Sequence, residues 1–154
     1  CMARLKGADT FHIDSSKSVL NWARQNMDAS RLLNIHWVLE DALKFAEREA
    51  RRGDFYDYII MDPPAWGNGT KGEKWKLEDK IDQLFAACAQ ILNPHGQLTL
   101  NTYSPSIEAS LLAELAEMYF EGRPHEQSGL YLESQTEKSL YCGELLRIGK
   151  SELQ

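Results

Sequence analysis

The sequence is poor in cysteine, in paired histidines and in long apolar runs, and each shortage excludes a class of protein. Its three cysteines, Cys1, Cys88 and Cys142, lack metal-site spacing and suit a reducing, cytoplasmic setting. No two of the four histidines stand at metal-ligand spacing, so we expect no metal site. No apolar run approaches the ~18 residues that span a bilayer, and no signal peptide is recognisable. We therefore expect no membrane partner.

Positive charge is also scarce. The chain has 17 lysines and arginines against 23 acidic residues, which gives a net charge of −6. This balance argues against a general nucleic-acid-binding surface but leaves room for a local basic patch. The 154 residues, 43% hydrophobic and 26% charged, are typical of one soluble domain, which we expect to cover residues 1–154. The sequence indicates no oligomeric state.

Strand and helix patterns alternate along the chain. Strands are predicted at 10–14, 35–39, 58–61 and 97–102, with amphipathic helices after each, and a hairpin is predicted over about 129–148 with a polar turn near 135–138. Helix 42–52 ends in Arg51, Arg52 and a glycine stop. This order predicts an α/β fold with a mostly parallel sheet, helices on both faces and an antiparallel edge.

The most informative stretch follows the third strand. Residues 58–61 indicate a strand buried on both faces, and Asp62 stands at its carboxyl end, where open α/β sheets bind their ligands. Pro63 and Pro64 cannot continue the sheet, so they form a stiff loop with carbonyl acceptors. Together with the flat face of Trp66, these groups suit a planar, amine-bearing ring. The alternative is a strand end with a helix-capping aspartate.

Acidic residues end two earlier strands as well. Asp14 ends the first strand, and Asp41 follows the second. Because the carboxyl ends of parallel strands share one edge, we expect both carboxylates to converge with Asp62 on a single crevice. Asp14 is placed to accept hydrogen bonds from ribose hydroxyls, and Asp41 with the Ala42 N–H is placed to meet an adenine edge. Each acid alone could instead be a helix N-cap.

Three segments carry a resemblance to a known family. His-Ile-Asp-Ser-Ser at 12–16, Glu-Asp-Ala-Leu-Lys-Phe at 40–45 and Met-Asp-Pro-Pro-Ala-Trp-Gly at 61–67 resemble successive motifs of class I S-adenosylmethionine-dependent methyltransferases. The group most similar is related to the bacterial large-subunit ribosomal RNA cytosine-5 methyltransferases. The likeness covers about residues 7–103 and implies a Rossmann-like fold, S-adenosylmethionine as cofactor and RNA as substrate.

The resemblance also implies residue roles. It implies that the cofactor is bound by Asp14, Ser15, Asp41, Ala42 and Asp62. It also implies that Asp62, Pro63 and Pro64 form the reaction centre and that Trp66 faces the substrate base. The protein's task would then be to align the nucleophile, methyl carbon and sulfur and to exclude water.

The sequence departs from the family pattern in two ways, which change what we expect of cofactor binding and of the methylated atom. The family's first strand and glycine-rich loop should precede residue 1, and residues 1–7 fit the end of the helix after that loop. We therefore interpret the chain as an N-terminally truncated catalytic domain and expect weak or no cofactor binding by it alone. The relatives' nucleophilic cysteine is also missing after the fourth strand, where Tyr103 stands. An exocyclic amine fits better than cytosine C5.

The loop over residues 67–76 supplies Lys71, Lys74, Lys76 and Trp75 beside this site. Basic side chains interleaved with an aromatic ring can grip a nucleic-acid backbone and stack a base. We interpret Lys71, Lys74 and Trp75 as substrate-binding, while a plain solvated loop has the same composition.

The leading hypothesis is a methyltransferase that modifies a base in RNA, most simply ribosomal RNA. A non-catalytic Rossmann-like binding or assembly module is an alternative. A nicotinamide-dependent oxidoreductase would share an acidic residue at the end of its second strand, as at Asp14, but it gives no reason for Asp62-Pro63-Pro64.

Overall fold

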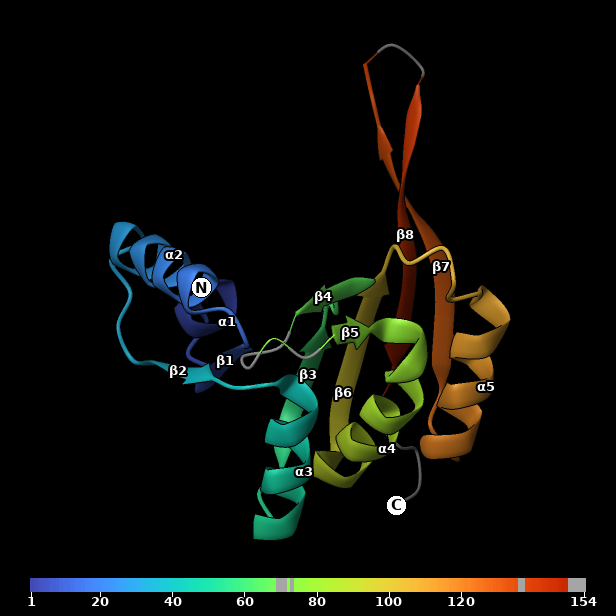
Figure 1. Cartoon of the computed structure of the whole chain (residues 1–154), viewed down its shortest axis with the longest axis horizontal. Helices are drawn as coiled ribbons and strands as arrows, with labels where there is room; N and C mark the ends of the chain where they lie inside the picture. The colour runs from blue at the N-terminus through green and yellow to red at the C-terminus, as the bar shows by residue number, and fades with distance from the viewer. Residues whose placement is uncertain (69–71, 73, 136–137, 150–154) are drawn as a thin grey trace. The chain divides into compact units, whose positions relative to one another are not determined.

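The computed structural model describes residues 1–68, 72, 74–135 and 138–149 (Figure 1). The chain divides into two compact units. Unit 1 comprises Cys1–Phe45 and Asn68–Glu73, and unit 2 comprises Ala46–Gly67 and Lys74–Gln154. The expectation of a single domain stays a prediction.

Unit 1 is built on two parallel strands. Its elements are α1 (Met2–Leu5), β1 (Thr10–Asp14), α2 (Lys17–Ala29) and β2 (Ile35–Leu39). Strand β1 pairs with β2 from Thr10 opposite Ile35 to Asp14 opposite Leu39. The Ser16 hydroxyl caps α2 by accepting a hydrogen bond from the Val19 N–H at 3.4 Å. Both strands have the predicted bounds, because each is a short apolar run closed by polar residues.

Helix α3 (Ala42–Arg52) leads from unit 1 into unit 2. The other elements of unit 2 are β3 (Tyr56–Met61), the helix α4 (Ile81–Ile91), β6 (Leu92–Thr102), α5 (Ala109–Tyr119), β7 (His125–Glu133) and β8 (Ser139–Ile148). The sheet order is β3-β6-β8-β7. Strands β3 and β6 are parallel, whereas β8 runs antiparallel to both β6 and β7. The expected α/β class, with parallel pairs and an antiparallel C-terminal hairpin, is confirmed.

The core of unit 2 lies between α4, α5 and one face of this sheet. Its largest fully buried side chains are Phe85, Leu77, Leu98, Leu100, Leu112, Leu146 and Ile148. Burying each such side chain stabilises the fold by about 1.5–3 kcal/mol. Cys88 of α4 packs on β3, with its Sγ 3.5 Å from the Met61 Sδ. This contact fixes α4 against the last residue of β3.

Strand β3 is not buried on both faces. Met61 is buried, but Tyr58 is exposed and Ile60 is 70% exposed. Alternation along a strand sends successive side chains to opposite faces, and α4 packs on the Met61 face. The apolar run therefore predicted the strand but overstated its burial.

A buried acid fixes the start of β3. The Glu49 carboxylate of α3 is only 5% exposed, and it accepts hydrogen bonds from the Tyr56 hydroxyl at 2.8 Å and from the Arg52 guanidinium at 3.0 Å. The Arg48 guanidinium donates a third at 3.1 Å. A buried carboxylate needs such partners, so this cluster joins α3 to β3.

Strand β6 follows α4 with no intervening loop, whereas the sequence predicted a break over 93–96 and a strand from Gln97. The register against β3 shifts between Tyr56 and Tyr58, which leaves an irregular stretch in the pairing. Arg123 donates to the carbonyls of Asn93 at 2.8 Å and Gly96 at 2.9 Å, and holds this stretch.

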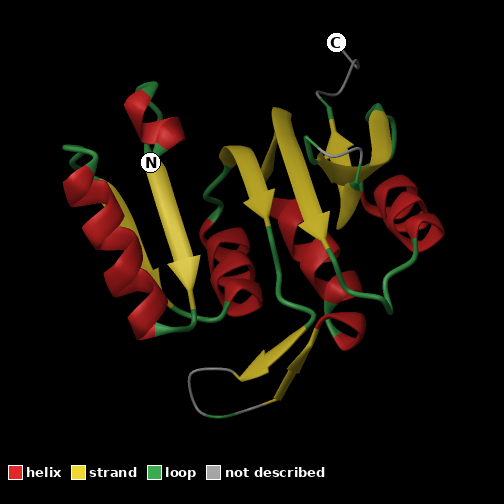
Figure 2. Cartoon of the chain, turned by 90° about the horizontal axis from the view of Figure 1, so that it is seen from above, coloured by secondary structure: helices red, strands yellow, loops and turns green. Residues whose placement is uncertain are grey.

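The remaining strands form two hairpins. The β7–β8 ribbon runs past the rest of the sheet (Figure 1), and its turn lies between Glu133 and Ser139, as predicted. A second, short pair joins β4 (Trp66–Asn68) and β5 (Lys74–Lys76) side by side (Figure 2). The 3₁₀ turn η1 (Leu77–Asp79) leads from β5 into α4. The sequence indicated only a loop there, since three-residue strands show no alternation.

Candidate functional site

Asp62 stands at the carboxyl end of the parallel pair β3–β6, where the sequence placed it. The preceding residue, Met61, pairs with Leu100 of β6, so the next residues along, Asp62 and Asn101, lie level with each other. The Asn101 Nδ2 donates a hydrogen bond to the Asp62 Oδ1 at 3.2 Å. Asp62 is exposed, and its second oxygen has no partner among the described residues. The Asp62 Oδ2 is therefore free to accept a hydrogen bond from a ligand.

The chain reverses direction directly after Asp62. The Pro64 carbonyl accepts a hydrogen bond from the Trp75 indole Nε1 at 3.0 Å. The Ala65 carbonyl accepts another from the Leu77 N–H at 3.0 Å. Of the two proline carbonyls, that of Pro63 accepts no hydrogen bond from any residue that the structure describes. The acceptors available at this turn are thus the Pro63 carbonyl and the Asp62 Oδ2.

The predicted substrate residues of the loop differ in their surroundings. Trp66 is 79% exposed and offers a broad aromatic face. Trp75 is half-buried, and its N–H is already used by Pro64. Lys74 is exposed, and Lys71 lies outside the described residues.

In unit 1, the acidic residues at the strand ends each accept a backbone hydrogen bond near the start of the next helix, but only Asp41 is a helix N-cap. The Asp14 Oδ1 accepts from the Ser16 N–H at 2.6 Å, and the Asp41 Oδ1 accepts from the Lys44 N–H at 3.1 Å. Ser15 lies between Asp14 and the cap residue, and Ala42 opens α3. The capping alternative therefore holds for one oxygen of Asp41, whereas Asp14 forms a turn that leads into the Ser16 cap of α2. That the two acids share a crevice with Asp62 stays a prediction.

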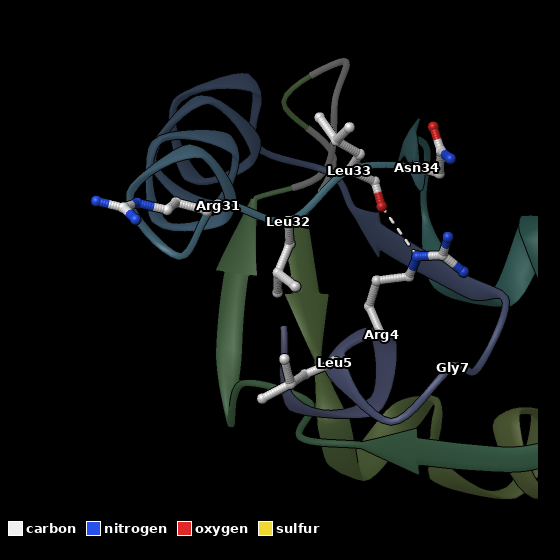
Figure 3. Close-up of a pocket in the computed structure, with 7 residues that line it drawn as sticks. All are labelled: Arg4, Leu5, Gly7, Arg31, Leu32, Leu33 and Asn34. Atoms are coloured by element: carbon white, nitrogen blue, oxygen red, sulfur yellow. Dashed lines mark hydrogen bonds between the residues drawn. The ribbon is translucent and has the colours of Figure 1, made fainter.

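A shallow hollow of about 490 Å³ lies elsewhere in unit 1 (Figure 3). Its lining residues are Arg4, Leu5, Gly7, Arg31, Leu32, Leu33 and Asn34. The Arg4 Nε donates to the Leu33 carbonyl across it at 2.9 Å. Because residues 31–34 precede β2, the hollow lies at the amino end of that strand. Open α/β sheets bind ligands at the carboxyl ends, so we assign it no cofactor role.

The buried thiol of Cys88 is not available as a nucleophile. Burial raises the pKa of the Cys88 thiol to about 12, so the reactive thiolate is absent at neutral pH. The half-buried Cys142 donates its S–H to the Leu140 carbonyl. Tyr103, in the expected cysteine position, is 59% exposed.

The described residues include no group of three or more histidines, cysteines and acids placed to hold a metal ion. In the same part of the chain, no helix combines the length and the apolar character needed to cross a membrane. Sequence reasoning missed Asn101, since an asparagine inside a strand carries no pattern. Only the register of β6 against β3 reveals that it meets Asp62.

No protein-family model matches the chain. Among curated proteins, it is 34% identical over 116 residues to ribosomal RNA large subunit methyltransferase I of Photobacterium profundum, with 66% of this chain and 26% of that protein covered. It is 30% identical over 100 residues to ribosomal RNA large subunit methyltransferase K/L of Pseudoalteromonas translucida, with 62% and 14% covered. The chain thus spans about a quarter or less of the length of these relatives.

Solved structures give a fuller match. The SAM-dependent methyltransferase from Agrobacterium tumefaciens is 32% identical, with a TM-score of 0.88 over 96% of this chain and 50% of that one. The structure of SMU.776 complexed with SAH is 20% identical, with a TM-score of 0.77 over 96% of this chain and 40% of that one. The second likeness shows a shared fold alone.

Proposed function

Because this chain has the Rossmann-like fold of class I S-adenosylmethionine-dependent methyltransferases, we propose that it contributes to methyl transfer from S-adenosylmethionine to a base in RNA. The observation that carries the proposal is the turn after β3. There Asp62 offers a free carboxylate oxygen, and Pro63 offers a free carbonyl on a stiff backbone. This placement supports recognition of a planar ring with an exocyclic amine.

The cofactor would supply a methyl group already activated on a sulfonium, so the protein need only align the reactants and exclude water. In this proposal, the second oxygens of Asp14 and Asp41 remain available to the ribose and adenine of the cofactor. The Ala42 N–H and Ser15 would complete that side. Asp62 and the Pro63 carbonyl would accept the N–H groups of the target amine, and Trp66 would stack on its ring.

An amine target agrees with the thiols of the chain. Cytosine C5 is a poor nucleophile that needs a cysteine thiolate, and the buried, protonated Cys88 cannot supply one. An exocyclic amine needs no covalent intermediate.

RNA, most simply ribosomal RNA, is the proposed substrate because the curated relatives carry ribosomal RNA methyltransferase names. The exposed Lys74 and Trp66 of the β4–β5 hairpin support this choice, since a cation and an aromatic face together bind single-stranded nucleic acid.

The test uses the natural protein that contains this sequence. Calorimetry should detect binding of S-adenosylmethionine, and label from its methyl group should enter ribosomal RNA. Asp62→Ala should abolish transfer while the circular dichroism spectrum persists. Asp28→Ala, an exposed acid of α2, should behave like the parent. A folded protein without cofactor binding would overturn the proposal, and transfer unaffected by Asp62→Ala would remove Asp62 from it.

A further inference from the structure

The sheet register brings Asn101 to the side chain of Asp62. Asn101 follows Leu100, whose partner on β3 is Met61, and its Nδ2 lies 3.2 Å from the Asp62 Oδ1. A carboxylate only accepts hydrogen bonds, so the amide must turn its NH₂ group toward Asp62. The contact therefore fixes both side chains.

The same orientation leaves the other end of the amide without a partner. The Asn101 Oδ1 is buried, and no described residue donates a hydrogen bond to it. A buried acceptor without a donor loses its bonds to water and gains nothing in exchange. We therefore expect asparagine at this position to cost the fold stability.

An apolar residue would suit the position better on structural grounds alone. Asn101 lies inside β6, and its antiparallel partner on β8 is the buried Leu145. Asparagine is also depleted in strands, whereas branched apolar residues are favoured. Polar groups that cost stability are characteristic of functional sites. The observed benefit of Asn101 is its hydrogen bond to Asp62.

We propose that Asn101 is a positioning residue, which holds the Asp62 carboxylate so that its free Oδ2 meets the target amine. The inference rests on the proposed function of Asp62. It adds that the orientation of the carboxylate is set by β6 and is maintained at a cost to stability.

The first test is Asn101→Leu in the natural protein. This near-isosteric change removes both the unpaired acceptor and the bond to Asp62. We expect a melting temperature equal to or above the parent's, an unchanged KM for S-adenosylmethionine, and a kcat lowered by about 10- to 100-fold. A lower melting temperature, or a parent-like kcat, would overturn the inference.

The second test is Asn101→Asp, which changes the pH dependence of methyl transfer. A residue that only stabilised the fold would not change that dependence. Two adjacent carboxylates repel, but a protonated one can donate its O–H to the other. The variant should therefore recover methyl transfer as the pH is lowered, relative to the parent at each pH. A pH profile parallel to the parent's would count against the inference.

Two controls separate the possible failures. Thr99→Val removes the 2.7 Å hydrogen bond between Thr99 and Tyr58 on the same two strands, and it should lower stability slightly without changing kcat. If Asp62→Ala abolishes transfer and Asn101→Leu does not lower it, this inference fails and the proposed function stands. If Asp62→Ala leaves transfer unchanged, this inference fails and Asp62 has no part in the proposed function.

Discussion

The indole of Trp75 is hydrogen-bonded to the backbone of Pro64, with its Nε1 3.0 Å from the carbonyl oxygen. Trp75 belongs to β5 and Pro64 to the turn after β3, so this bond closes the segment between them. The β4–β5 hairpin is thereby anchored two residues from Asp62. Trp75 anchors the β4–β5 hairpin to the turn after β3. The exposed Trp66 offers its ring for stacking.

Replacing Trp75 by Phe should loosen this hairpin while keeping an aromatic ring. A neutral hydrogen bond contributes about 1 kcal/mol, so we expect the KM for RNA to rise by about fivefold. The affinity for S-adenosylmethionine should not change, and steady-state kinetics at varied RNA concentration measure the effect.

Trp22→Phe is the matched control, because Trp22 is an exposed tryptophan of α2 in unit 1. It should leave the KM for RNA unchanged. Equal effects of the two substitutions would argue against a specific role for the Trp75 bond.

The buried cluster around Glu49 should contribute strongly to stability. Glu49→Gln keeps the shape but removes the charge that Arg48 and Arg52 contact, and we expect a loss of about 1.5–3 kcal/mol. Urea denaturation measures it. Glu47→Gln, an exposed neighbour on α3, should change stability by less than about 0.5 kcal/mol.

The same cluster predicts a dependence on pH. Burial alone would raise the pKa of Glu49, but the hydrogen bonds from Tyr56 and Arg48 and the charges of both arginines outweigh it and hold the pKa below 4.5. The stabilisation is thus complete above pH 4.5 and is lost as the pH falls through the folded-state value. The stability difference between the parent and Glu49→Gln should shrink below pH 4.5.

The buried Cys88 should resist modification in the folded chain. Its pKa is raised to about 12 by burial, and thiol reagents attack the thiolate. With Ellman's reagent at pH 8, we expect Cys1 and Cys142 of the 154-residue chain to react rapidly and Cys88 only after unfolding in urea. Mapping the modified peptides identifies the sites. Rapid labelling of Cys88 would contradict the packing of α4 on Met61.

Gly143 of β8 should not tolerate a side chain. Its φ of +108° is unfavourable for other residues, and an added Cβ would collide with the backbone carbonyl of Thr102 on β6. We expect Gly143→Ala to cost at least about 2 kcal/mol, seen as a lower midpoint of thermal unfolding. Gly67→Ala, where the nearest atom is a Pro64 side-chain carbon at 3.9 Å, should change the midpoint little.

The elements with a clear local pattern could be predicted from the sequence. The two strands of unit 1 and helix α3 have the predicted bounds, because each combines a period with a polar or glycine stop. Asp62 was likewise placed at a strand end by the abrupt change from an apolar run to two prolines.

Features set by contacts between distant residues were not predictable. Trp75 of the β4–β5 hairpin is bonded to Pro64, and Arg123 is bonded to the first part of β6. The exposure of Ile60 follows from which face of β3 meets α4. Asn101 joined the candidate site only through strand register, which no local pattern encodes.

The sheet order also has a consequence for biosynthesis. Strand β3 leaves the ribosome well before its partner β6, and β6 in turn lies beside β8, which follows the other strands of this sheet in the sequence. Forming such non-local parallel pairs is slow because a long loop must close first, whereas the β7–β8 hairpin closes locally. We expect nascent chains arrested before Ile148 clears the exit tunnel to remain sensitive to protease, and longer ones to become resistant. Asp62 and Asn101 would then meet only when synthesis of the sheet is almost complete.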